Sequence, residues 1–263
     1  MGNYTLGIDV GSTTSKCIIL EDGKTVVAKS LIPFGTGTSG PDRVIESVLR
    51  QGKFSKKEIE CTVATGYGRR AKGIADFEMS ELSCHAKGAQ FLCPDVRTVI
   101  DIGGQDTKVI GLENGCLSSF QMNDKCAAGT GRYLDVMSNV LGIEVSELGE
   151  LGAQSKQPAQ ISSTCTVFAE SEVISQLSKG TEVRDIIAGI HRSVASKVTG
   201  LVLRVGLHEP VMMTGGVSQN KDIVHAIEQE LKCSLFISEL SQYAGALGAA
   251  VYGYQKVMCE RGN

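Results

Sequence analysis

Ile8-Asp-Val-Gly-Ser-Thr-Thr-Ser-Lys-Cys-Ile-Ile-Leu-Glu-Asp-Gly23 aligns without a gap on Ile100-Asp-Ile-Gly-Gly-Gln-Asp-Thr-Lys-Val-Ile-Gly-Leu-Glu-Asn-Gly115, 92 positions later. Eight of the sixteen positions are identical, where composition alone predicts about one. Each copy predicts an apolar strand ending in Asp, a turn led by Gly, a second apolar strand, and a hairpin turn. The chain is therefore predicted to contain two related lobes that face one another across a cleft.

Bulk composition narrows the class of protein. The chain has 263 residues, of which 42% are hydrophobic and 21% charged, as in ordinary globular proteins. A net charge of −3 with scattered Lys and Arg residues excludes nucleic acid as an expected partner. Since no apolar run reaches membrane-spanning length and the sequence shows no leader pattern, we expect a cytoplasmic protein with no membrane partner.

Cysteine spacing limits the kinds of metal site. The nine cysteines are irregularly spaced and form no Cys-x-x-Cys, which argues against a disulfide framework and against a self-contained zinc or ferredoxin-type site. Any metal site needs cysteines that are far apart in sequence, or a second chain.

Strand and helix patterns give an α/β organisation without a low-complexity linker. We expect a first lobe at residues 1–95, completed by a C-terminal helix at 244–263, and a second lobe at 96–243. Outside the two hairpins, we expect strands near Thr25–Ile32 and Cys61–Ala64 and one ending at Thr214, and helices at 41–49, Glu78–Phe91, Gly131–Leu141, Val167–Ser178, 187–205 and Gly245–Tyr254.

The two Gly-led turns carry groups that bind phosphate, since backbone N–H groups and hydroxyls bind anionic oxygens. The expected contacts are Gly11, Ser12, Thr13, Thr14, Ser15, Lys16, Gly103, Gly104 and Gln105. Asp9 and Asp101 are oxygen ligands suited to Mg²⁺, and Gln105 is our candidate for orienting the attacking water. Residues 35–40 spell Gly-x-Gly-x-x-Gly, but they follow the third strand of a meander and Pro33, which disfavours a dinucleotide site.

These motifs resemble those of the actin, Hsp70 and sugar-kinase superfamily. Residues 7–16 resemble its first phosphate motif, 100–106 its second, 213–217 its adenosine motif, and 245–250 its closing helix. The resemblance implies a duplicated actin-like ATPase (ribonuclease H-like) fold with two lobes around a nucleotide cleft. It adds Gly215, Gly216 and Gln242 to the expected ATP or ADP contacts.

Cys126 and Cys165 each lead into a predicted helix. The positive end of a helix stabilises a thiolate and a bound anionic cluster. A four-iron four-sulfur cluster takes four thiolates, so a symmetric dimer could supply two from each chain. The alternative is that both are small buried side chains, as free cysteines usually are.

Over nearly its whole length the chain resembles the activators (component A) of 2-hydroxyacyl-CoA dehydratases, most closely the 2-hydroxyglutaryl-CoA type, in the BadF/BadG/BcrA/BcrD ATPase family. Residues 79–85, 121–132 and 161–172 carry this likeness. It implies one 4Fe-4S cluster per homodimer, held by Cys126 and Cys165, and ATP-driven transfer of one low-potential electron to the dehydratase (component D). It also implies reduced ferredoxin or flavodoxin as donor, and an oxygen-sensitive protein of amino-acid fermentation.

Three other functions fit parts of the sequence. An ATPase subunit of a benzoyl-CoA reductase-type enzyme is related to the activators. A small-molecule kinase of the same fold needs an acceptor pocket with a catalytic Asp, and the chain has no large insertion to form one. An ATP-dependent interaction protein would lack the cluster and its colour.

For the cysteines other than Cys126 and Cys165 we expect packing roles, including Cys84 beside His85, which we place in a core or interface. We assign no catalytic role to His191, His208 or His225.

Overall fold

The computed structural model describes residues 2–71, 73–162 and 165–262. The chain forms two compact units, the first made of Met1–Asp95, Asn114–Leu117 and Ser238–Asn263, and the second of Val96–Glu113 and Ser118–Ile237. Compared with the predicted lobes, residues 114–117 and 238–243 group with the first unit.

The first unit contains a five-stranded sheet in the order β3-β2-β1-β4-β5. Its strands are β1 (Tyr4–Val10), β2 (Ser15–Glu21), β3 (Thr25–Ile32), β4 (Ile59–Thr65) and β5 (Phe77–Glu78). β1, β2 and β3 form the predicted antiparallel meander, and β4 runs parallel to β1. Asp22 and Gly23, between β2 and β3, have φ of 50° and 67°, as a type I′ hairpin turn requires.

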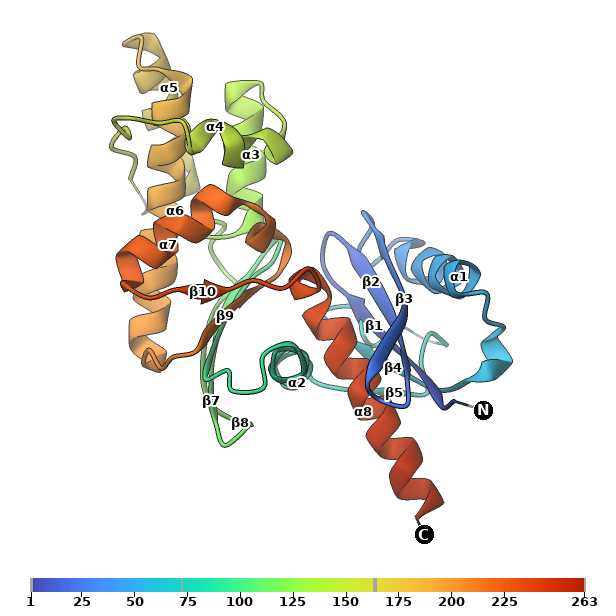
Figure 1. The fold of residues 1–263 in the computed structure, drawn as a ribbon. Helices are drawn as coiled ribbons and strands as arrows, with labels where there is room; N and C mark the ends of the chain where they lie inside the picture. The colour runs from blue at the N-terminus through green and yellow to red at the C-terminus, as the bar shows by residue number, and fades with distance from the viewer. Residues whose placement is uncertain (1, 72, 163–164, 263) are drawn as a thin grey trace. The chain divides into compact units, whose positions relative to one another are not determined.

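Helices cover both faces of this sheet (Figure 1). They are α1 (Gly40–Gly52), α2 (Glu81–Leu92) and α8 (Ala244–Arg261). Successive strand residues point to opposite faces, so Ile8 and Cys17 pack with Val44 of α1, whereas Ile18 and Leu20 pack with α8.

Glycines allow α2 and α8 to pack closely. A Cβ on Gly248 would overlap the carbonyl of Cys84, and one on Gly88 would overlap the carbonyl of Ala244. Gly7 of β1 contacts the backbone of α8 in the same way. The Gly- and Ala-rich composition that predicted a closing helix is therefore what lets the helix seat on this unit.

The second unit contains a five-stranded sheet in the order β10-β9-β6-β7-β8. Its strands are β6 (Thr98–Ile102), β7 (Thr107–Glu113), β8 (Cys116–Asn123), β9 (Val211–Thr214) and β10 (Leu235–Phe236). Asn114 and Gly115, between β7 and β8, have φ of 51° and 74°, which repeats the turn of the first unit. The duplicated sequence thus forms duplicated hairpins.

A long helix forms the centre of the second unit's core. The helices are α3 (Gly131–Leu141), α4 (Leu148–Gly152), α5 (Thr166–Ser178), α6 (Val183–Val205) and α7 (Lys221–Leu231). Helical spacing in the sequence predicts an apolar face on α6, and the prediction is confirmed, because Ile187, Ile190, Val194 and Val198 are buried. By length and composition α6 could cross a membrane, but 67% of its most apolar window is buried inside the protein, as expected of a core helix.

One expectation about a helix boundary is wrong, and one helix has an unusually exposed apolar surface. α2 begins at Glu81 rather than Glu78, because Glu78 pairs in β5 and the Ser80 side chain caps the helix. α5 buries only Ala169 and Val173, and its larger apolar side chains are exposed instead: Val167, Phe168, Ile174 and Leu177.

Candidate functional site

A buried aspartate and a lysine face each other across the first hairpin. Asp9 near the end of β1 is opposite Lys16 on β2, and Lys16 Nζ lies 3.5 Å from Asp9 Oδ2. The turn between them closes through a hydrogen bond from Gly11 N to Thr14 O. Asp9 is only 3% exposed, so neighbouring groups rather than water must stabilise its carboxylate.

The second hairpin repeats this arrangement. Asp101 is opposite Lys108, the Nζ–Oδ2 distance is again 3.5 Å, and Gly103 N donates to Asp106 O. The offset of 92 positions that aligns the sequences therefore also aligns the ion pairs and the turns.

The two aspartates differ in the contacts of Oδ1, the carboxylate oxygen that does not pair with the lysine. Thr214 Oγ1 donates to Asp101 Oδ1 at 2.8 Å, and Lys108 also pairs with Asp106 at 2.7 Å. Among the described residues, Asp9 Oδ1 is buried and has no hydrogen-bond partner. A buried carboxylate oxygen without a donor costs free energy unless a ligand contacts it.

Two glycines leave space around the Asp9 carboxylate. A Cβ on Gly66 would overlap Asp9 Oδ1. A Cβ on Gly245 would lie 3.0 Å from Asp9 Oδ2 and 2.9 Å from His85 Nε2. Buried His85 therefore lies close to this carboxylate, which sequence reasoning did not foresee. The packing role predicted for His85 is confirmed by its burial.

The other predicted phosphate contacts occupy varied positions. Ser12 and Thr14 are partly exposed at the first turn, Thr13 and Gln105 are exposed, and Gly103 and Gly104 are partly exposed. Ser15 is buried, and its hydroxyl donates to the Phe34 carbonyl. The Ser15 hydroxyl proton is therefore engaged in a hydrogen bond within the first unit.

The predicted adenosine residues follow β9 and precede α8. Gly215 has φ of 84°, and a Cβ there would overlap Ile102 O. Gly216 begins a 3₁₀ turn, Gly216–Gln219. Gln242 is half-buried in another, Ser241–Tyr243. Within the second unit, Gly215 and Gly216 directly follow Thr214, the donor to Asp101.

The loop that carries Cys126 is hydrogen-bonded to the second turn. Thr107 Oγ1 donates to Gly129 O at 2.5 Å, and Gly131 N donates to Gly103 O at 2.8 Å. Asn123 Nδ2 donates to the carbonyl of Cys126 itself at 2.8 Å. The turn and the Cys126 loop therefore form one hydrogen-bonded structure.

Cys126 and Cys165 differ in their position relative to a helix. Cys165 is the N-cap residue of α5, as predicted. Cys126 lies in the loop before α3, whose N-cap is Thr130, so the expectation that Cys126 sits at a helix N-terminus is wrong. Asn123 causes the difference, because its amide holds this loop in a non-helical turn. Ser163 and Thr164, in the predicted motif before Cys165, lie outside the described residues.

The remaining cysteines only partly follow the packing prediction. Cys17, Cys61 and Cys84 are buried, and burial raises the pKa of Cys61 to about 11 and that of Cys84 to about 12. Burial therefore disfavours the reactive thiolate form of Cys61 and Cys84. Cys116 and Cys259 are exposed, so the prediction is wrong for those two. Cys93 and Cys233 are half-buried.

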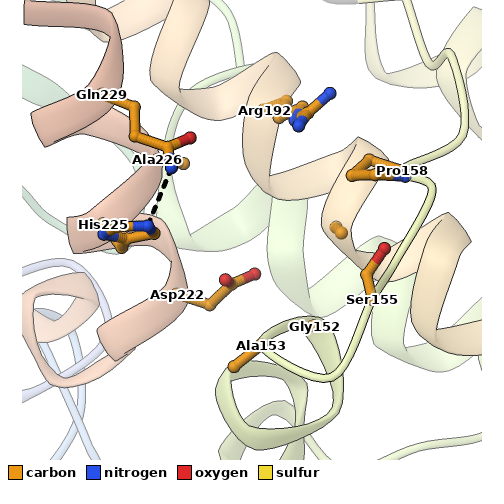
Figure 2. A pocket seen from close by; sticks show the side chains of 10 residues that line it. Gly152, Ala153, Ser155, Pro158, Arg192, Asp222, His225, Ala226 and Gln229 are labelled. Carbon is orange, nitrogen blue, oxygen red and sulfur yellow. Dashed lines mark hydrogen bonds between the residues drawn. The ribbon is translucent and has the colours of Figure 1, made fainter.

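A separate pocket of about 200 Å³ lies among α4, α6 and α7 (Figure 2). Ser155, Arg192, Asp222, His225 and Gln229 line it with several smaller residues. None of the predicted site residues contributes to its lining. Within the described part of the chain, no three His, Cys, Asp or Glu side chains are grouped to hold a metal ion.

The profile of the BadF/BadG/BcrA/BcrD ATPase family matches residues 6–253. The chain belongs to this ATPase family. The match includes both Asp–Lys hairpins, both candidate cysteines and the loop after β9.

One relative in this family is the (R)-2-hydroxyglutaryl-CoA dehydratase activating ATPase of Acidaminococcus fermentans, 65% identical over 97% of this chain and 99% of that protein. The crystal structure of component A of that dehydratase matches with a TM-score of 0.95. The Clostridium difficile activator of 2-hydroxyisocaproyl-CoA dehydratase, solved with bound ADPNP, is 50% identical over 98% of this chain and 97% of its own, with a TM-score of 0.96. A benzoyl-CoA reductase subunit of Thauera aromatica is 30% identical over 95% of this chain and 92% of that protein.

More distant structures share only the fold of the family. A ROK family glucokinase from Streptomyces griseus matches 96% of this chain and all of its own with a TM-score of 0.56 and 14% identity. The predicted duplicated actin-like α/β fold is confirmed.

Sequence reasoning missed several residues around the aspartates of this ATPase. They are Gly66, His85, Asp106, Lys108 and Thr214. Lys108 could have been found, because it aligns with Lys16 at the offset of 92. Gly66 and His85 could not, since their approach to Asp9 depends on how β4, α2 and α8 pack.

Proposed function

We propose that this protein is an ATP-dependent activator of a 2-hydroxyacyl-CoA dehydratase, of the 2-hydroxyglutaryl-CoA type. In this proposal it takes an electron from reduced ferredoxin or flavodoxin and passes it to the dehydratase through a 4Fe-4S cluster shared by a homodimer. One observation carries the proposal: the second Asp–Lys turn is hydrogen-bonded to the loop that carries Cys126. A change at the turn therefore has a direct route to a cluster ligand.

The residues around Asp9 fit a Mg²⁺–nucleotide. Asp9 Oδ1 is a buried hard oxygen that lacks a protein donor among the described residues, and Mg²⁺ prefers such ligands. Lys16 is partly exposed beside it and can pair with a phosphate. The same role for Asp101, and the contact of one nucleotide with both turns, Gly215, Gly216 and Gln242, stay predictions. Bound Mg²⁺ would neutralise charge on the phosphate oxygens during hydrolysis.

The candidate cysteines fit a cluster only if two chains share it. Cys126 and Cys165 are partly exposed, although Cys126 also packs against the core of the second unit. A 4Fe-4S cluster takes four thiolates, and the described residues of one chain group no third metal ligand with these two. A twofold dimer would bring the four together.

The surface beside Cys165 supports this dimer. Val167 and Phe168, directly after it on α5, are 66% and 65% exposed, and Ile174 and Leu177 extend the apolar surface along the helix. Exposed apolar patches of this kind mark protein interfaces. A partner that covered α5 would also shield a cluster bound at its N-terminus from water.

Energetics explain why an electron carrier would consume ATP. Transferring one electron to an acceptor whose reduction potential is 59 mV lower costs about 1.4 kcal/mol. A difference of several hundred millivolts therefore requires several kcal/mol. Nucleotide hydrolysis can supply this amount. The benzoyl-CoA reductase alternative has weaker support, because that relative is 30% identical to this chain, against 65% for the dehydratase-activating ATPase.

Iron content and mass test the shared cluster. We expect the anaerobically purified protein to be a brown dimer with about four irons per two chains, because each chain supplies two of four thiolates. Iron analysis combined with light scattering measures both quantities. About four irons per chain, or a monomer that keeps a full cluster, would contradict the proposal.

A further inference from the structure

The two copies of the Asp–Lys pair have different surroundings, although their backbones match. In the second copy, Asp101 accepts from Thr214 through Oδ1 and pairs with Lys108 through Oδ2. Lys108 is also held by Asp106 at 2.7 Å, and its side chain is 2% exposed. The protein itself therefore engages both oxygens of Asp101 and the ammonium of Lys108.

The first copy lacks two of these contacts. The position equivalent to Asp106 is Thr14, 92 residues earlier, which carries no charge. Lys16 is 13% exposed and its ion pair is with Asp9. Asp9 Oδ1 is buried without a hydrogen-bond partner among the described residues. This copy keeps one acceptor and one partly exposed cation for a ligand.

Strand pairing explains why the threonines behave differently. Thr65 is opposite Asp9 and Thr214 is opposite Asp101, each in parallel register. Thr65 Oγ1 donates instead to Met79 O at 3.1 Å, because the chain leaving β5 runs beside β4. In the second unit β10 pairs only as far as Met212, and the Thr214 hydroxyl turns to Asp101. The neighbouring strand therefore pairs one residue closer to Thr65 than to Thr214, and this difference accounts for which aspartate accepts a threonine hydroxyl.

We propose that the duplicated aspartates have divided one task. Asp9 and Lys16 contact the Mg²⁺–nucleotide, whereas Asp101, with Thr214, Lys108 and Asp106, is a positioning group that fixes the turn hydrogen-bonded to the Cys126 loop. This inference rests on the proposed nucleotide function and deepens it, because it assigns the metal-responsive role to Asp9 alone and replaces the sequence-based expectation that Asp101 also holds Mg²⁺.

The division has opposite consequences for the nucleotide-free protein. Asp9→Asn removes a buried negative charge whose Oδ1 has no donor among the described residues, at the cost of the ion pair with the partly exposed Lys16. Removing the Thr214 hydroxyl takes away a buried hydrogen bond to Asp101, which destabilises the protein. The Thr65 hydroxyl donates to the carbonyl of Met79, a partly exposed residue. Removing this hydroxyl should therefore destabilise the protein less.

Thermal unfolding of four variants tests the division. The pairs are Asp9→Asn with Asp101→Asn, and Thr65→Val with Thr214→Val, and each is measured without nucleotide, with ADP and EDTA, and with ADP and Mg²⁺. We expect Thr214→Val to lower the nucleotide-free midpoint by roughly 2–10 °C, and Thr65→Val to lower it by less than half as much. In Asp9→Asn, adding Mg²⁺ to the ADP-bound protein should no longer raise the unfolding midpoint. In Asp101→Asn, Mg²⁺ should still raise the unfolding midpoint by most of the wild-type amount, whereas the nucleotide-free midpoint should be lower than in the wild type.

The outcomes separate this inference from the proposed function. If the wild-type protein shows no rise with ADP and Mg²⁺, the nucleotide function fails and the division fails with it. If the wild type responds but Asp101→Asn loses the Mg²⁺ effect as fully as Asp9→Asn, with an unchanged nucleotide-free midpoint, only the division is overturned. Equal destabilisation by the two valine variants would also overturn it.

Discussion

Cys126→Ser and Cys165→Ser are each expected to abolish the iron–sulfur cluster. Iron should fall from about four atoms per two chains to near zero, because each variant removes two of the four thiolates from the dimer. A serine hydroxyl does not replace a thiolate, which is the form that ligates metal. Iron analysis and the visible spectrum of anaerobically purified protein measure the loss. ATP binding should persist, since the Asp9 turn lies in the other unit of the chain.

Cys93→Ser and Cys233→Ser serve as matched controls. Both residues are half-buried like the candidate ligands, so serine there perturbs packing to a similar degree. The controls should keep the full iron content. A normal cluster spectrum in either Cys126→Ser or Cys165→Ser would show that the ligands are misassigned.

Asp9→Asn is expected to reduce ATP hydrolysis by roughly 10²-fold or more, the size of effect seen when a preorganised charge at a reacting centre is removed. Asp9 is buried, has a free acceptor among the described residues and pairs with Lys16. The asparagine amide keeps the shape but loses the charge that holds Mg²⁺. Steady-state phosphate release measures the rate, and the cluster absorbance should stay unchanged.

Asp42→Asn is the control for that variant. Asp42 is an exposed carboxylate in the first turn of α1, in the same unit, and its loss should leave hydrolysis within about twofold, as for most surface changes. Near-normal hydrolysis by Asp9→Asn would break the link between the repeated hairpins and the nucleotide.

Local patterns made much of the fold predictable. The offset of 92 positions anticipated the register of both hairpins, since Asp9 is opposite Lys16 and Asp101 is opposite Lys108. The buried stripe of α6 followed from helical spacing. These features depend on residues close in sequence, so their periodicity is enough to predict them.

The surroundings of each side chain depend on distant residues, and there the sequence was insufficient. Nothing local distinguishes Thr65 from Thr214, because the difference lies in where the neighbouring strand pairs: β5 reaches Ala64, next to Thr65, whereas β10 stops at Met212, two residues before Thr214. Cys126 precedes an apolar helix just as Cys165 does, but it lies in a loop held by the Asn123 amide, and the helix is capped by Thr130 instead. The exposure of Val167 and Phe168 is also not encoded in α5 itself, because an apolar face looks alike whether a core or another chain covers it.

Activation of a dehydratase tests the central claim most directly. The reduced protein is mixed anaerobically with 2-hydroxyglutaryl-CoA dehydratase, and substrate dehydration is followed with ATP and Mg²⁺, with ADP, and without nucleotide. We predict that the dehydratase becomes active only with ATP and Mg²⁺, and that the Cys165→Ser protein fails to activate it under any condition. Equal activation without nucleotide, or activation by the protein that lacks its cluster, would contradict an ATP-driven electron carrier.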